Sequence, residues 1–188
     1  MSIVNTAEGY GALTKLFHWL IVVLFLLQYV GGAIMTSMEW GQTVAGLSQA
    51  FYYNWHKSLG LVALAIAIPR LLNRQVGSLP PWAPGLTSLA QRFVHRCEQV
   101  LYLAMFVMPV SGYIYVMAGD FGVNLFGVYK LYNPIGKWEA MAAAGKWVHI
   151  VSGYVLMAAI LGHLAVVFRH QFWLKDGLLK RMLPNNNR

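Results

Sequence analysis

Two histidines near the end of the chain, His149 and His163, lie fourteen residues apart within one apolar stretch. In an α-helix fourteen residues make nearly four whole turns and a rise of about 21 Å, so the two imidazoles share a helix face at opposite ends of a membrane crossing. Imidazole nitrogens are common ligands of metal ions and of haem iron. Two other apolar stretches each carry a histidine near one end, His18 and His56. One helix with two ligands and two helices with one ligand each could hold two haems stacked across a bilayer.

The four histidines agree in depth as two pairs. His18 and His163 fall near one end of their stretches, and His56 and His149 fall near the other end. We predict that each pair supplies two axial ligands, from different helices, to a six-coordinate b-type haem iron. A single buried histidine is more simply explained by a hydrogen bond to a neighbouring helix, but four histidines at two matched depths favour haem ligation. A zinc or copper ion is a weaker alternative, because its ligands would have to converge at one depth.

The segments that must position these histidines are long and apolar. The chain has 188 residues, of which 58% are hydrophobic and 11% are charged, whereas about a quarter of a soluble domain is charged. Four segments approach the ~20 residues that a helix needs to cross a bilayer; they cover about residues 16–35, 53–72, 100–118 and 147–168. We therefore predict an all-α fold, an integral membrane four-helix bundle that forms one domain over residues 1–188.

The distribution of basic residues predicts the orientation of this bundle. With four crossings both termini lie on one side, and ten of the fourteen Lys and Arg residues fall on that side, whereas the six acidic residues divide equally. The positive-inside rule then places both termini in the cytoplasm. Because topology accounts for the net charge of +8, we predict membrane lipid around the bundle and no nucleic-acid partner.

Small side chains and one arginine lie at helical spacing from the histidines. Three small residues follow His56 on its face: Gly60, Ala63 and Ala67. Gly32 lies fourteen residues after His18, and Arg70 lies fourteen residues after His56, at the depth of the other histidine pair. The Arg70 guanidinium could pair there with a haem propionate. Small residues also favour ordinary packing between membrane helices, which explains them equally well when they are considered alone.

Cys97 is the only cysteine. A single cysteine excludes a disulfide within the chain and an Fe–S cluster held by this chain alone. It also excludes a covalently attached haem, which requires a C-x-x-C-H run. Any haem in this protein is therefore bound non-covalently.

Two further histidines fall outside the predicted pairs. His170 lies seven residues after His163, just beyond the span, and could replace it as a ligand only if the haem lay in the headgroup zone. A position beside a quinone or a haem propionate is the simpler interpretation of His170. His95, between Arg92 and Arg96, is most simply an interfacial residue, with quinone binding or proton supply as alternatives.

The segments that carry these residues resemble the bacterial cytochrome b561 family. The matching segments are Phe17-His18-Trp19-Leu20, His56-Lys57-Ser58-Leu59-Gly60, Arg70-Leu71-Leu72-Asn73-Arg74, Pro109-Val110-Ser111-Gly112-Tyr113, and His149 to His163 followed by His170 and residues 175–182. Some relatives have paired histidines after the last span, where this chain reads His170-Gln171, or a histidine near Glu98. These departures concern quinone binding and leave the four ligand positions unchanged.

The resemblance implies a four-helix protein of the bacterial inner membrane with two non-covalent b haems. It implies that His18 and His163 hold the iron on the cytoplasmic side, and that His56 and His149 hold the iron on the periplasmic side. Members of the family pass electrons between a periplasmic partner and the quinone pool. One branch oxidises superoxide and delivers the electron to ubiquinone.

Two functions from different classes follow. The leading one is a di-haem cytochrome b that transfers electrons across the inner membrane between a periplasmic donor, with superoxide as the candidate, and the ubiquinone pool, which would make it a superoxide:ubiquinone oxidoreductase. The alternative is a membrane-anchoring electron-transfer subunit of a periplasmic dehydrogenase or hydrogenase. Four lysines on the side opposite the termini could attract superoxide or merely solvate the loops: Lys57, Lys130, Lys137 and Lys146. A haem-free structural membrane protein is a third possibility.

Overall fold

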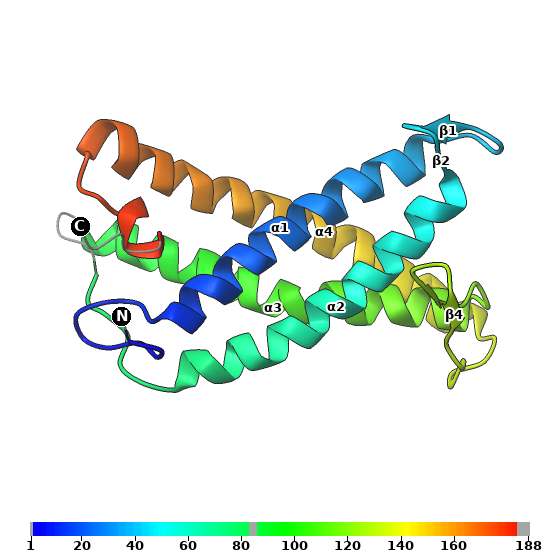
Figure 1. Cartoon of the computed structure of the whole chain (residues 1–188), viewed down its shortest axis with the longest axis horizontal. Coiled ribbons are helices and arrows are strands. Elements are labelled where there is room, and N and C mark those ends of the chain that lie inside the picture. Colours follow the sequence, from blue (N-terminus) through cyan, green and yellow to red (C-terminus); the bar gives the residue numbers. More distant parts are fainter. Residues whose placement is uncertain (1, 83–85, 184–188) are drawn as a thin grey trace.

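Four long helices run along the whole length of the molecule (Figure 1). They are α1 (Ala12–Ser37), α2 (Gln49–Gln75), α3 (Ser88–Ala118) and α4 (Glu139–Phe168). The structure, a computed structural model, describes residues 2–82 and 86–183. Each of these helices is long and apolar enough to cross a membrane, which confirms the predicted all-α membrane bundle.

The side chains of the helices are distributed as expected for a bundle surrounded by lipid. Large apolar residues such as Leu26 and Leu103 are exposed on the outside, and small residues such as Ala63 and Ala67 are buried between helices. In lipid the backbone must satisfy its hydrogen bonds internally, which a helix does. α3 begins at Ser88, well before the predicted span at residue 100, because the Thr87 hydroxyl caps it by accepting a hydrogen bond from the Ala90 N–H.

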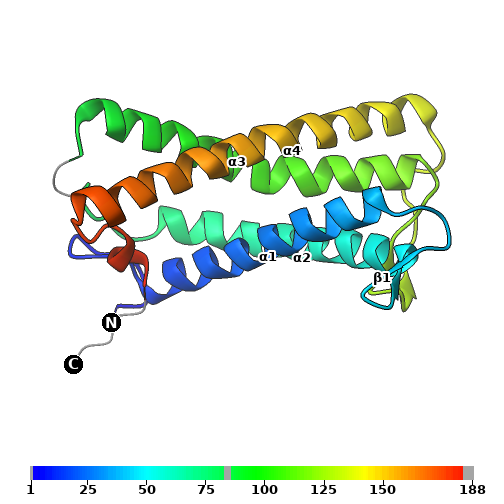
Figure 2. The ribbon, with the colours of Figure 1, turned by 90° about the horizontal axis from the view of Figure 1, so that it is seen from above.

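The helices form two hairpin layers. Figure 2 shows α1 beside α2 in one layer and α3 beside α4 in the other. α4 packs most extensively along α3, and α1 packs along α2. In the described part of the chain neither α1 nor α2 packs closely along α4. The two layers therefore meet mainly through α2 and α3, and α4 stands off from the first two helices.

Two short β-hairpins mark one end of the bundle, which we call the hairpin end. β1 (Thr43–Val44) pairs with β2 (Leu47–Ser48), and β3 (Asn124–Leu125) pairs with β4 (Tyr129–Lys130), both antiparallel. The β3–β4 hairpin is anchored on α2, where the Phe126 N–H donates to the Ser58 hydroxyl at 2.7 Å. The β3–β4 hairpin is thus a structured cover over the end of α2.

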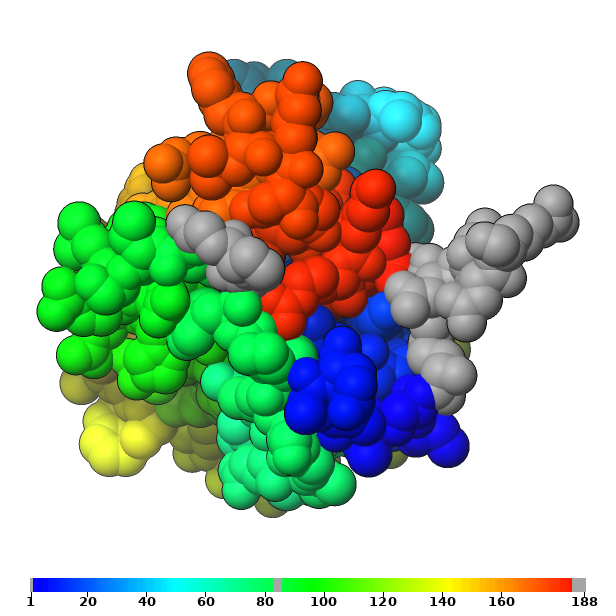
Figure 3. Space-filling model, turned by 90° about the vertical axis from the view of Figure 1, so that its left-hand side faces the viewer, coloured from blue at the N-terminus to red at the C-terminus, as the bar shows by residue number. Residues whose placement is uncertain are grey.

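The opposite end, which we call the terminal end, gathers the two ends of the described chain. After α4 a single π-helix, η1 (Arg169–Leu174), and a 3₁₀ helix, η2 (Leu179–Met182), bring the chain back toward α1. The Trp19 indole N–H donates to the Met182 carbonyl at 2.9 Å, and the Lys15 ammonium donates to the Leu183 carbonyl at 2.9 Å. Figure 3 shows this end, with the red C-terminal segment lying against the blue N-terminal segment.

Candidate cofactor sites

His18 and His163 face each other near the terminal end of the bundle. His18 comes from the second turn of α1 and His163 from the last turns of α4. The centres of their imidazole rings are 6.3 Å apart, and the ring planes are inclined by 57°. The structure thus brings together the two histidines that the depth argument pairs.

His56 and His149 face each other in the same way toward the hairpin end. His56 lies in the second turn of α2, and His149 lies in the third turn of α4. Their ring centres are 6.1 Å apart, and the ring planes are inclined by 83°. No third His, Cys, Asp or Glu side chain completes a metal-binding group with either pair among the described residues.

The spacing within both pairs fits a haem iron. Two imidazoles that bind opposite faces of one metal through nitrogens about 2.0 Å away place their ring centres about 6 Å apart. Both pairs also join α4 to a helix that does not pack closely along it. A porphyrin needs such room, because it lies between the two ligand-bearing helices.

Two glycines lie against the rings of the hairpin-end pair. A Cβ at Gly112 on α3 would lie 3.0 Å from Cε1 and Nδ1 of His149. A Cβ at Gly32 on α1 would lie 3.5 Å from Cε1 of His56. The contact at Gly112 is too close for any larger side chain unless the ring moves. Gly32 is predicted from its offset from His18, whereas no spacing in the sequence predicts a role for Gly112.

Arg70 lies near the terminal-end pair with part of its charge unpaired. Its Nε and Nη1 groups are buried and have no hydrogen-bond partner, and its guanidinium lies over the Tyr102 ring at 5.4 Å. A buried cation with unused donors is costly unless an anion accepts from it. The carboxylate of a haem propionate would satisfy these donors. Tyr102 was not found from the sequence, because a tyrosine in an apolar helix carries no distinguishing spacing.

His170 belongs to neither pair and makes its own contact. Its side chain is only 1% exposed, and its Nδ1 hydrogen-bonds the carboxylate of Asp176, which follows the π-helix. Its Nε2 is buried without a partner. Burial acts to raise the pKa of Asp176, but the hydrogen bonds from His170 and from the Leu178 N–H outweigh it and hold that pKa below the usual value.

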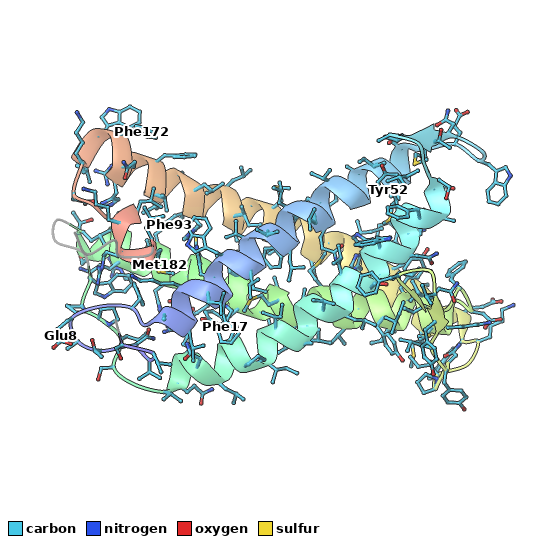
Figure 4. All side chains as sticks on the ribbon, viewed as in Figure 1. Glu8, Phe17, Tyr52, Phe93, Phe172 and Met182 are labelled. Carbon is cyan, nitrogen blue, oxygen red and sulfur yellow. The ribbon has the colours of Figure 1, made fainter. Side chains whose placement is uncertain are left out.

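A cavity of about 410 Å³ opens beside His170 at the terminal end. Its walls are mostly apolar and come from the start of α3 and the end of α4, and include Leu89, Phe93 and Val166; Figure 4 shows Phe93 at this end of the bundle. His95 does not line it: its side chain is half exposed and its Nδ1 lies 3.8 Å from the Glu98 carboxylate. Single π-helical turns often mark functional sites, and this one carries His170.

A membrane bundle that sets two facing imidazole pairs at different depths has the design of a membrane-bound cytochrome b. Residues 9–185 match the family described as prokaryotic cytochrome b561, and this chain belongs to that family. It is therefore a multi-pass protein of the bacterial inner membrane that binds haem b and takes part in membrane electron transfer.

Two relatives show how far the similarity extends. The chain is 28% identical over 198 aligned residues to cytochrome b561 homolog 2 of Escherichia coli (strain K12), which covers 100% of this chain and 97% of the relative. It is 23% identical over 181 residues to the probable superoxide oxidase CybB of Yersinia pestis, which covers 94% of this chain and 97% of that relative.

Proposed function

We propose that this protein holds two non-covalent b haems and transfers electrons between a periplasmic donor, superoxide in the first instance, and the ubiquinone pool. The observation that carries the proposal is the pair of facing imidazole couples, with ring centres 6.3 Å and 6.1 Å apart. When bound, haem supplies reversible one-electron transfer at each of the two depths. Two histidines would hold each haem, His18 with His163 and His56 with His149, so reactants would exchange electrons with the cofactor without binding its iron.

The proposed orientation places the terminal end in the cytoplasm. The excess of Lys and Arg at this end supports it through the positive-inside rule. His18 and His163 then hold the cytoplasmic-side haem, and His56 and His149 hold the periplasmic-side haem. The unused donors of Arg70 bind a propionate of the cytoplasmic-side haem.

Ubiquinone is assigned to the cavity beside His170. A quinone ring needs apolar walls and one polar group that can exchange a proton with its oxygen. The cavity offers apolar walls such as Phe93 and Val166, and the Nε2 of His170 is the buried polar group without a partner. Because Asp176 accepts the Nδ1–H of His170, the Nε2 lone pair remains free to accept a proton from quinol or, once protonated, to donate one.

Other candidates for quinone contact are less suitable. Arg74 is already paired with Glu98 at 3.1 Å and lies over Tyr102. His95 is half exposed and lies near the same carboxylate. Neither is among the residues that line the cavity.

Superoxide is the proposed donor because a basic residue lies beside His56 of the hairpin-end pair. Lys57 follows His56 directly in α2, and its ammonium donates to the Gly122 carbonyl at 2.9 Å, which holds it against the segment that links α3 to β3. A fixed cation next to the proposed haem ligand attracts an anion. The similarity to a probable superoxide oxidase supports the same donor.

Rapid mixing of the purified, oxidised protein with superoxide tests the proposal. We expect the reduced b-type absorption band to grow faster than superoxide disappears by spontaneous dismutation, and added ubiquinone to reverse the growth. If superoxide produces no such band while ubiquinol does, superoxide is not the donor, but the role in electron transfer is still supported. If neither reductant produces it, the proposed function is wrong.

The alternative role as a membrane-anchoring subunit has one observation in its favour. The connections at the hairpin end expose large side chains, with Trp40 96% and Val128 90% accessible, and such side chains suit either the headgroup layer or a protein partner. Stable copurification with a periplasmic dehydrogenase or hydrogenase would favour this role. Isolation of the chain alone, with both haems and superoxide-driven reduction, would exclude it.

A further inference from the structure

Gln28 is the one amide within an otherwise apolar part of α1, and it contacts the helix that carries His56. We propose that its side-chain oxygen accepts the Nδ1–H of His56 and thereby fixes the orientation and basicity of that ligand. The proposal rests on the ligand role given to His56 under the proposed function. It makes Gln28 a positioning residue for the periplasmic-side haem.

The NH2 group of the Gln28 amide already makes a hydrogen bond to the residue that we propose it orients. Its Nε2 donates to the backbone carbonyl of His56 itself at 3.0 Å. Its Oε1 is buried and has no partner. A buried acceptor without a donor is costly within a membrane span, where water cannot replace the missing partner.

The side chain of His56 lacks a hydrogen-bond partner at the same contact. Its Nδ1 is buried and has no partner. That nitrogen faces α1, because a Cβ at Gly32, one turn beyond Gln28, would lie 3.7 Å from it. A spare acceptor and a spare donor thus lie at the same contact between α1 and α2.

The close fit of the two helices holds the amide at this contact. A Cβ at Gly60 on α2 would lie 3.1 Å from Nε2 of Gln28, so a larger residue there would displace the amide by a few tenths of an ångström. Gly60 lies one turn beyond His56 on α2, as Gly32 lies one turn beyond Gln28 on α1. The two glycines therefore make room for the amide and for the ring.

The other member of the same pair shows what His56 lacks. The Nδ1 of His149 lies 2.9 Å from the Met108 carbonyl, which accepts its proton. Metal-binding histidines almost always donate their second N–H in this way, and removing that acceptor typically weakens metal binding 10- to 100-fold. An acceptor at Nδ1 also makes the imidazole a stronger electron donor, which favours the oxidised iron and lowers its reduction potential.

The simpler explanation is that Gln28 only ties α1 to α2, and Tyr29 provides a matched control for it. The Tyr29 hydroxyl on the same helix donates to the Gly153 carbonyl of α4 at 2.8 Å. Tyr29→Phe therefore removes a hydrogen bond between helices without removing an acceptor from a histidine. If Gln28 only joins two helices, substitution of Gln28 and substitution of Tyr29 should have the same effect on the haem.

Redox titration of the purified holoprotein tests the proposal, together with transfer of haem to apomyoglobin. Gln28→Leu is expected to raise the potential of the periplasmic-side haem and to weaken its retention about 10-fold or more. Gln28→Glu keeps an acceptor and is expected to leave the potential at or below that of the unchanged protein. Tyr29→Phe is expected to change neither the potential nor the retention of this haem. The potential and the retention of the cytoplasmic-side haem should stay constant in all three variants.

The outcomes separate this proposal from the function on which it rests. His56→Ala identifies the periplasmic-side haem by the one that it removes; if both haems persist in it, the ligand assignment itself is wrong. If His56→Ala removes one haem but Gln28→Leu changes neither potential nor retention, or matches Tyr29→Phe, the role of Gln28 is refuted. If Gln28→Leu does not accumulate, Gln28→Glu decides, because a raised potential in that variant contradicts the proposal.

Discussion

Replacing Gly112 with alanine is expected to weaken binding of the proposed periplasmic-side haem while leaving the helices intact. The added methyl group would stand 3.0 Å from Cε1 and Nδ1 of His149, whereas unstrained carbon contacts lie at about 3.5–4.0 Å. The ring or the α3 backbone must therefore move by a few tenths of an ångström. The ring cannot yield freely, since its Nδ1 is held by the Met108 carbonyl at 2.9 Å.

The expected loss of haem affinity follows from the narrow range of metal–nitrogen distances in protein sites. Ligand distances in metal sites hold within about ±0.2 Å, so a shift of a few tenths of an ångström exceeds this tolerance. We expect haem affinity at this site to fall about 10- to 100-fold, as it does when a supporting group of a ligand is lost. Alanine in a helix interior favours the helix over glycine by about 0.5–1 kcal/mol. The stability of the haem-free protein should therefore stay constant or rise.

The assay is the number of haems per chain by pyridine haemochrome, with helix content and thermal unfolding measured by circular dichroism. Val110→Leu provides the control, because it also adds one carbon to α3 but at a position that is 43% exposed. Retention of both haems with unchanged affinity in Gly112→Ala would refute the reasoning. Loss of haem from both variants would show that α3 tolerates no added volume, and would remove the special role of the His149 contact.

Three further predictions concern the other site residues. His149→Ala should lose only the periplasmic-side haem and His18→Ala only the cytoplasmic-side haem, and pyridine haemochrome showing two haems in both would disprove the pairing. Arg70→Leu should weaken retention of the cytoplasmic-side haem about 10-fold by removing the charge for its propionate, whereas the exposed Arg92→Leu should not, as measured by transfer to apomyoglobin. Asp176→Asn should slow reduction of ubiquinone about 10²-fold by disturbing the buried imidazole that exchanges the proton, with both haems present; an unchanged rate of haem reoxidation by ubiquinone would exclude a quinone site there.

The bundle and the histidine pairs could be anticipated because helix geometry in a membrane leaves little freedom. A helix is the structure that satisfies the backbone in lipid, so hydropathy located all four helices. A fourteen-residue interval then fixed the relative depth of His149 and His163 without knowledge of any neighbour. Depth alone was enough to pair them with His18 and His56, and the structure brings the ring centres of the two pairs to 6.3 Å and 6.1 Å.

What could not be anticipated depends on rotation and contact between helices. The sequence gives no measure of how far α1 turns toward α2, so the contact of Gln28 with the His56 carbonyl was not foreseen, although an amide in an apolar span was itself a signal. The approach of Gly112 to His149 depends equally on how α3 meets α4. The contact of His170 with Asp176 requires the wider turn of the π-helix, which propensities do not predict.

The division of the bundle into two hairpins has a consequence for the order in which the protein matures. The α1–α2 hairpin carries His18 and His56, and the α3–α4 hairpin carries His149 and His163, so neither hairpin contains a complete haem site. Under the proposed ligation no haem can be fully ligated before the fourth helix has been synthesised and inserted. Cofactor delivery then becomes a late step that follows insertion. Each haem would link the α1–α2 hairpin to the α3–α4 hairpin, which otherwise contact each other mainly through α2 and α3. A shortage of haem would leave two inserted but loosely associated halves, which is the form that membrane quality control would encounter.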